Sequence, residues 1–286
     1  MRRREYEGII AMLSSSFFFS LMNIGVSLVS PVLNSFYITL FRQFFALLPV
    51  AIFIYWRRDW VYLKTKRLSG HFLRSLLGTI SMVSYFYSFK FLPITEVISL
   101  SYTRPLFLCL LSPFLLQEKV SLERWLLVCV GFMGVAIMLQ PEGQNFNGLG
   151  VAIGLLAAFF SSLVSILIRQ LGQTEKSSTI VFYYCLFSSV FMLPVVGANK
   201  AQILPADQTI WWILMGIGLV GGIGQMLITK GLSSLSASLA GSLEYGALLW
   251  ITLFQYLFFH QLPAINSLLG ALVIVSSGVM LLRKRR

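Results

Sequence analysis

Two residues of opposite charge lie inside stretches of the sequence that are apolar enough to cross a membrane. Arg104 stands near the centre of "ITEVISLSYTRPLFLCLLSPFLL" and is followed at once by Pro105, and Glu244 stands in "SLEYGALLW". An arginine at the bilayer midplane costs about 2.5–3.5 kcal/mol, so it needs a partner, a water-filled cavity, or both. Such a pair could bind a small organic molecule, with Arg104 attracting a carboxylate and Glu244 attracting an ammonium group.

A second interpretation stays open for this pair. The two side chains could form a buried ion pair that fixes helix packing and contacts no ligand. Pro105 is equally ambiguous: it frees a backbone carbonyl that a cavity could use, yet proline is also tolerated in membrane helices for packing alone.

Further polar side chains in apolar stretches are candidates to line the same site. Their amide and phenol groups could donate or accept hydrogen bonds and could stack on an organic molecule, but each could instead make a structural hydrogen bond between helices. These candidate substrate-binding residues are Asn23, Tyr85, Tyr102, Gln225 and Tyr245.

Arg42 and Arg74 also fall within apolar stretches. For Arg42 we expect either snorkelling, in which the guanidinium reaches back to the membrane surface, or a role guarding the outer entrance. For Arg74, which is predicted close to a helix end, we expect snorkelling.

The elements that carry these residues must be membrane helices. The chain has 286 residues, of which 57% are apolar and 11% are charged, whereas soluble domains carry about 25% charged residues. At roughly 20 apolar residues per span, the sequence divides into ten spans. They cover 8–29, 35–55, 71–89, 94–116, 124–140, 148–168, 178–196, 209–229, 236–257 and 264–282.

The net charge of +12 is unevenly distributed. Lys and Arg cluster at 2–4, 57–67 and 283–286, whereas the loops on the other side of the predicted membrane carry only Lys90 and Lys200. This asymmetry follows the positive-inside rule with both termini in the cytoplasm. It disfavours a basic face for nucleic acid, so we expect the lipid bilayer and no nucleic acid as a partner.

The two halves of the chain resemble each other. The polar stripe Ser16, Ser20, Asn23 and Ser27 recurs as Ala158, Ser162, Ser165 and Arg169, and "LLP" at 47–49 recurs as "MLP" at 192–194. Because five spans is an odd number, the second half would enter the membrane from the opposite side, which is typical of secondary transporters. We therefore predict an all-α integral membrane protein of ten helices in two inverted five-helix repeats, 8–140 and 148–282. Under the repeat offset Glu244 corresponds to Tyr102, so both charges should lie at similar depth.

The sequence does not predict an enzyme, a cofactor or a metal site. "GIGLVG" at 216–221 has the spacing of a dinucleotide fingerprint, but no strand precedes it, so its glycines indicate close helix packing. His71 and His260 have no second ligand nearby, and the three cysteines lie in apolar spans.

Long stretches of both halves resemble the EamA-type branch of the drug/metabolite transporter superfamily. The resemblance is carried by 74–141 and 237–281, with Pro105 before Leu-Phe, then Glu118, then Gly131 and Gly134 in the fifth span. It implies a ten-helix basket whose central cavity is lined by the first four helices of each half, with the fifth and tenth at the periphery. Members move small metabolites such as amino acids, purines, riboflavin and S-adenosylmethionine.

The sequence departs from that family in two places. Arg104 stands before the proline where an apolar residue is usual, which makes it a candidate specificity element. Phe259-His260 replaces the usual Gly-Glu before the last loop, so no role is carried over to that position.

Together these features predict a secondary active transporter of a small polar or zwitterionic organic metabolite in the bacterial inner membrane. We expect transport to be driven either by the gradient of a proton or another coupling ion, with protonation of Glu244 as one such coupling step, or by the substrate's own gradient. The alternative is a membrane scaffold or lipid-handling subunit with a sealed core. A cavity that reaches Arg104 favours the transporter, and a dry, enclosed pair favours the scaffold. Glycines in the fifth span permit a homodimer but do not require one.

Overall fold

The computed structural model describes residues 3–115, 122–138, 147–198, 207–235, 243–244, 246–260 and 265–283. Every regular element in these ranges is helical. The elements are α1 (Arg3–Val29), α2 (Ser35–Arg57), the short 3₁₀ helix η1 (Asp59–Leu63), α3 (Leu68–Ser88), α4 (Ile94–Ser101), α5 (Arg104–Leu115), α6 (Leu122–Met138), α7 (Gly148–Leu171), α8 (Ser177–Ala198), α9 (Gln208–Ser234), α11 (Ala247–Phe259) and α12 (Ile265–Arg283).

The helix ends follow from local side-chain chemistry. Asn147 accepts a hydrogen bond from the backbone N–H of Gly150 at the start of α7, and Asp207 accepts one from Thr209 at the start of α9. Both side chains satisfy donors that the first turn of a helix leaves without an intrahelical partner. At the C-terminal end of α2, Arg58 adopts a left-handed conformation (φ 54°) that ends the helix.

Helix length and surface composition fit a multi-pass membrane protein. Five of the described helices, namely α1, α2, α7, α8 and α9, are long and apolar enough to cross a membrane. Large apolar side chains point outward from the bundle: Trp56 is 79% exposed and Leu249 is 78% exposed. A soluble protein rarely leaves so many such side chains exposed, whereas a bilayer surrounds them with acyl chains.

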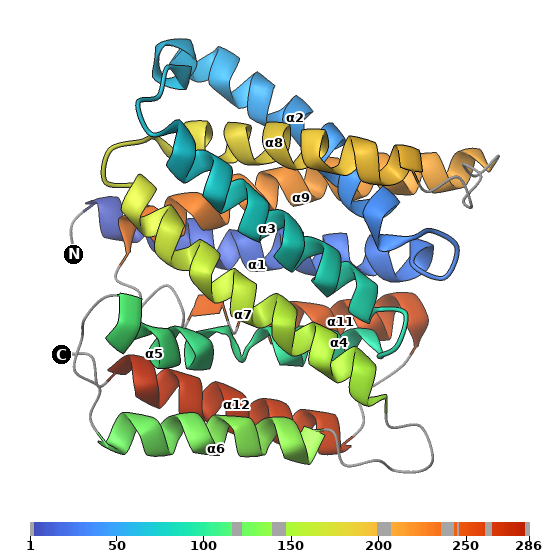
Figure 1. Cartoon of the computed structure of the whole chain (residues 1–286). Coiled ribbons are helices and arrows are strands. Elements are labelled where there is room, and N and C mark those ends of the chain that lie inside the picture. The colour runs from blue at the N-terminus through green and yellow to red at the C-terminus, as the bar shows by residue number, and fades with distance from the viewer. Residues whose placement is uncertain are drawn as a thin grey trace.

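The helices pack in pairs that join distant parts of the chain (Figure 1). α1 lies against α9, α3 against α7, and α2 against both α8 and α9. α6 and α12 lie side by side along one flank of the bundle, at the bottom of Figure 1. The resemblance placed the fifth and tenth helices at the periphery, and this is where α6 and α12 lie.

The predicted continuous span over 94–116 is wrong in one respect, because α4 ends at Ser101 and α5 begins at Arg104. Pro105 has no N–H to donate to the carbonyl one turn earlier, so an uninterrupted helix would lose a hydrogen bond here. Two hydroxyls at the break turn back onto the chain: Ser101 Oγ donates to the Ile98 carbonyl and Thr103 Oγ1 donates to the Leu100 carbonyl. Tyr102 and Thr103 therefore form a turn inside an apolar segment.

The predicted span over 236–257 has a similar interruption. Gly246 is a turn residue immediately before α11, which begins at Ala247. Residues 236–242 and Tyr245 lie outside the described residues. Turn residues thus lie close to Arg104 in one half and close to Glu244 in the other.

The fifth-span glycines are used inside the chain. A Cβ on Gly131 would meet Leu106 at 2.6 Å, and one on Gly134 would meet the backbone carbonyl of Gly270 in α12 at 2.9 Å. These glycines bring α6 close to its own neighbours, so the observation that permitted a homodimer no longer supports one.

Candidate functional site

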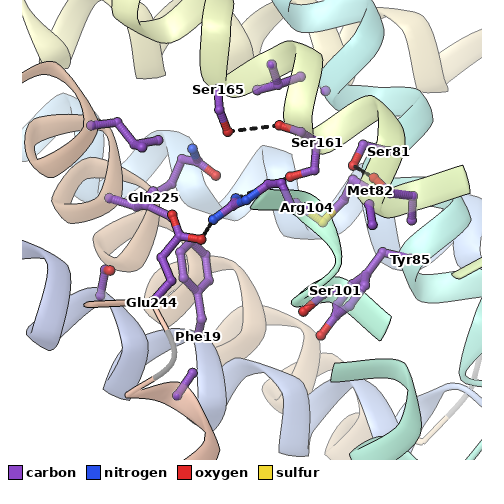
Figure 2. A pocket seen from close by; sticks show the side chains of 18 of the residues that line it. Phe19, Ser81, Met82, Tyr85, Ser101, Arg104, Ser161, Ser165, Gln225 and Glu244 are labelled. Atoms are coloured by element: carbon purple, nitrogen blue, oxygen red, sulfur yellow. Dashed lines mark hydrogen bonds and ion pairs between the residues drawn. The ribbon is translucent and has the colours of Figure 1, made fainter. Parts of the chain in front are cut away.

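A cavity of about 210 Å³ lies between helices of both halves, with α1, α3, α4 and α5 on one part of its wall and α7, α8, α9 and α11 on the rest. At roughly 30 Å³ per water molecule this space exceeds a few ordered waters. Figure 2 shows Arg104 and Glu244 extending toward each other across it, with serines from α3, α4 and α7 around them.

Arg104 and Glu244 form an ion pair between Nη2 and Oε2 inside this cavity. Their side chains are 18% and 15% exposed, so the pair is in contact with the cavity rather than enclosed by Leu and Phe. Arg104 also donates from Nη1 to Ser161 Oγ of α7 at 3.3 Å. The break between α4 and α5 places Arg104 in the first turn of α5, where the helix dipole adds positive potential.

The structure brings most of the predicted site residues together. Asn23 of α1, Tyr85 of α3, Tyr102 at the α4–α5 break and Gln225 of α9 all line the cavity that holds Arg104 and Glu244. Tyr245 lies outside the described residues. That these residues bind a substrate stays a prediction.

Hydroxyl groups supply most of the remaining polar surface of the cavity, and the sequence analysis did not choose them as site residues. They come from both halves, and three of them lie in the stripes used there as evidence for a repeat: Ser16 and Ser20 in the first half and Ser165 in the second. The same polar stripe could therefore have identified them. The full set is Ser15, Ser16, Ser20, Ser81, Ser101, Ser161 and Ser165.

The expectation that Arg74 snorkels is wrong, and neither interpretation of Arg42 describes where it lies. Arg42 is 0% exposed and Arg74 is 1% exposed, so neither guanidinium reaches the surface of the protein. Arg42 donates to the Gly221 carbonyl at 3.1 Å, and the guanidinium carbon of Arg74 lies 3.6 Å from the centroid of the Tyr184 ring. A backbone carbonyl holds Arg42, and an aromatic ring holds Arg74, where both side chains point inward.

Sequence reasoning therefore missed Arg74 and Tyr184, both of which line the cavity. Hydropathy gives the depth of a residue but not the face of the helix on which it lies. A signal was present nonetheless: Arg74 is spaced four and seven residues from Gly78 and Ser81, which puts all three on one face of α3.

Comparison with known proteins relates the whole chain to one family. Residues 6–140 and 148–283 match the model of the EamA-like transporter family. A riboflavin transporter from Vibrio cholerae is 32% identical over 75% of this chain and 72% of its own length. A pseudopaline exporter from Pseudomonas aeruginosa is 26% identical over 98% and 97% of the two chains. An S-adenosylmethionine uptake transporter from Rickettsia felis is 27% identical over 87% and 83%.

A protein of known crystal structure has the same fold. Its structure matches this one with a TM-score of 0.69 over 96% of this chain and 94% of the other, at 18% sequence identity. This likeness concerns the arrangement of the helices and carries no information about substrate.

Proposed function

Because the chain belongs to the EamA-like transporter family and is a membrane transporter rather than an enzyme, we propose that it moves a small polar or zwitterionic organic metabolite by alternating access. The membrane would be the inner membrane of a bacterium, with both termini in the cytoplasm. The named relatives in this family transport or export riboflavin, pseudopaline and S-adenosylmethionine.

One observation carries this proposal: the Arg104–Glu244 pair joins the two halves of the chain inside a cavity with a serine-rich wall. A carboxylate of the substrate would take the place of Glu244 beside Arg104, and an ammonium group would take the place of Arg104 beside Glu244. Exchange of one ion pair for two keeps every charge partnered in a region of low dielectric. A scaffold has no need for a cavity at this position.

The helix contacts support two inverted five-helix repeats, 8–140 and 148–282. In the two repeats α1 corresponds to α7, α2 to α8, α3 to α9 and α6 to α12. Exchanging each helix for its counterpart therefore turns the α1–α9 contact into the α7–α3 contact, and the α2–α9 contact into the α8–α3 contact. The α2–α8 and α6–α12 contacts are each transformed into themselves. A pseudo-twofold relation of this kind is typical of secondary transporters that work by alternating access.

The described ends of the helices support the proposed orientation. α1 begins and α12 ends at the same end of the bundle, at the left in Figure 1, where the α2–α3 and α7–α8 connections also lie. The basic residues Arg57, Arg58 and Arg67 belong to this end. Under the positive-inside rule it would face the cytoplasm.

The test is binding followed by transport. Purified protein would be screened by thermal shift against amino acids, nucleosides and charged cofactors, because a ligand that binds only the folded state raises the melting temperature. The best ligand would then be supplied in radiolabelled form to proteoliposomes. We expect Arg104→Gln and Glu244→Gln to lose uptake while retaining monodisperse elution.

The matched control is Lys230→Gln, which removes one partner of an exposed ion pair with Glu7 at 3.1 Å. Exposed pairs contribute little to stability, so this variant should transport at the parent rate. Equal uptake by all four proteins would show that the midplane pair is structural and would overturn the proposal. A dependence of parent uptake on an imposed proton gradient would show that transport is coupled to protons.

A further inference from the structure

A second group of side chains, two of them arginines, lies at the cavity wall in addition to the Arg104–Glu244 pair. We call it the arginine wall; it consists of Arg42 from α2, Arg74 from α3, Tyr184 from α8 and Gln225 from α9. Arg74, Tyr184 and Gln225 line the cavity, and Arg42 lies directly behind them. The guanidinium carbons of Arg74 and Arg42 lie 3.6 Å and 5.9 Å from the centroid of the Tyr184 ring, so both cations lie near the same aromatic ring.

The two arginines differ in how their donors are used. Arg42 Nη1 donates to Gln43 Oε1 at 2.5 Å, and Nη2 donates to the Gly221 carbonyl at 3.1 Å and to Gln225 Oε1 at 3.4 Å. Arg74 Nε and Nη1 are buried and have no hydrogen-bond partner within the part of the chain that the structure describes. An arginine offers five donors in a planar fork that matches a carboxylate, so Arg74 has donors to spare next to the cavity.

The charges around the cavity do not balance. Among the described residues that line it, Glu244 is the single acid, and it is paired with Arg104. Arg74 and Arg42 add two further positive charges with no acid in contact in the described ranges. Burying a charge without a partner is costly, and two like charges beside one ring repel each other as well. A cavity with this excess of positive charge attracts an anion.

We propose that the arginine wall is an anion subsite, and that the transported substrate carries a second carboxylate in addition to the carboxylate–ammonium unit recognised at Arg104 and Glu244. The substrate class is therefore an amino dicarboxylate or a larger zwitterion with a net negative charge. This inference rests on the proposed function, because it assigns a further group of the same substrate to a further part of the same cavity. Arg74 would bind that carboxylate with its two unused donors, while Arg42 orients Gln225 from behind.

The experiment compares ligands that differ by one charge and little else. Aspartate, glutamate and 2-aminoadipate would each be titrated beside the corresponding side-chain amide, with dissociation constants taken from melting-temperature shifts. We expect the parent to bind at least one dicarboxylate about tenfold to a hundredfold more tightly than its amide, the range for a hydrogen bond to a charged group. Arg74→Gln should lose this preference and retain binding of the amide, and Arg74→Lys should keep part of it.

The fold of the variants is tested at the same time. Because Arg74→Gln removes an unpartnered buried charge, its melting temperature without ligand should equal or exceed that of the parent. If it fails to fold, Arg74→Lys replaces it: the charge stays but the planar fork is lost, and the dicarboxylate preference should fall by about tenfold.

Three results would overturn the proposal: no preference for any dicarboxylate in the parent, an unchanged preference in Arg74→Gln, or stabilisation by chloride alone that abolishes the preference. The Arg104→Gln variant separates this proposal from the proposed function. If it loses amides and dicarboxylates alike while Arg74→Gln keeps the preference, the function stands and the subsite fails. If Arg74→Gln loses the preference while Arg104→Gln binds as the parent does, the subsite stands and the midplane pair is structural.

Discussion

At the scale of single residues, the cavity holds two arginines, one with an acidic partner and one with none among the residues that the structure describes. Arg104 is stabilised by Glu244 and Ser161, and it stands at the start of α5. Arg74 has the Tyr184 ring as its close contact, and cation–π attraction offsets only part of the cost of burial. The difference fits the proposed site, in which Arg104 would exchange Glu244 for a substrate carboxylate and Arg74 would gain an anionic partner only when substrate binds.

The Arg104–Glu244 pair should be energetically coupled. Removing either partner leaves a half-buried charge without its counter-ion, so Arg104→Gln and Glu244→Gln should each lower the melting temperature in detergent. The double variant should melt higher than the sum of the single effects predicts, by a coupling of about 1–2 kcal/mol. A double-mutant cycle with thermal unfolding measures this quantity. Additive single effects would contradict the direct interaction.

The sequence predicts this pair for a physical reason and fails at Arg74 for another. An ionisable residue in an apolar run is expensive wherever it points, so Arg104 and Glu244 stand out from sequence alone. Arg74 lies near a helix end, where a long side chain could reach the surface, and the sequence does not show which face of α3 it occupies. Only the packing of α8, which brings Tyr184 over the guanidinium, decides this.

At the scale of elements, the bundle depends on close approach between α2 and α9. The glycines of "GIGLVG" in α9 have unequal surroundings. A Cβ on Gly218 would meet Phe45 Cβ at 2.3 Å and the Arg42 carbonyl at 3.2 Å, whereas a Cβ on Gly216 would meet nothing within 4 Å. The packing interpretation of this motif therefore holds for Gly218, and Gly216 is open.

These two glycines form a matched pair for mutation. Gly216→Ala should raise the melting temperature slightly, because alanine is favoured over glycine in a helix by about 0.5–1 kcal/mol. Gly218→Ala should lower it, since α2 and α9 must move apart at a cost of about 1–3 kcal/mol or more. Thermal unfolding of both variants in one detergent checks the prediction. Equal effects at the two positions would show that α2 and α9 do not pack as described.

The positions of the helices, but not their interruptions, could be predicted from the sequence. Apolar length alone places the predicted spans 35–55 and 148–168 within α2 and α7. The break at Tyr102 and Thr103 is two residues long and lies inside an apolar run, so hydropathy does not reveal it. Pro105 marks the place, but proline can also bend a membrane helix without ending it.

At the scale of the whole molecule, the two halves are joined by a polar network at the end proposed to face the cytoplasm. Asp59 of η1 accepts from Lys176 at 2.6 Å and from Ser178 at 3.2 Å, and Thr65 donates to Glu175 at 2.6 Å. These contacts link the α2–α3 connection of the first half to the α7–α8 region of the second. Under alternating access this end must open. The strength of the network would therefore set the equilibrium between the forms that are closed and open at this end.

Asp59→Asn should favour the state that is open at this end. Asp59 is only 7% exposed, and its charge-assisted hydrogen bonds are each worth about 1.5–3 kcal/mol, or about tenfold or more in the equilibrium between closed and open forms. The measurement is the rate at which a membrane-impermeant maleimide labels a cysteine at Ser165 on the cavity wall. The native cysteines would be replaced, and vesicles would expose the proposed cytoplasmic side. We expect labelling about tenfold faster than in the parent.

Lys230→Gln is the control for this opening. It breaks the ion pair with Glu7, which lies at the same end of the bundle as Asp59 but whose side chains are 42–44% exposed. Exposed pairs contribute about 0–1 kcal/mol, so labelling should stay within about a factor of two of the parent. Faster labelling in Asp59→Asn alone means that the buried contacts of Asp59 hold the two halves together. An equal increase in both variants means that surface charge near the entrance controls the reagent, and no change in either means that this network is not the gate.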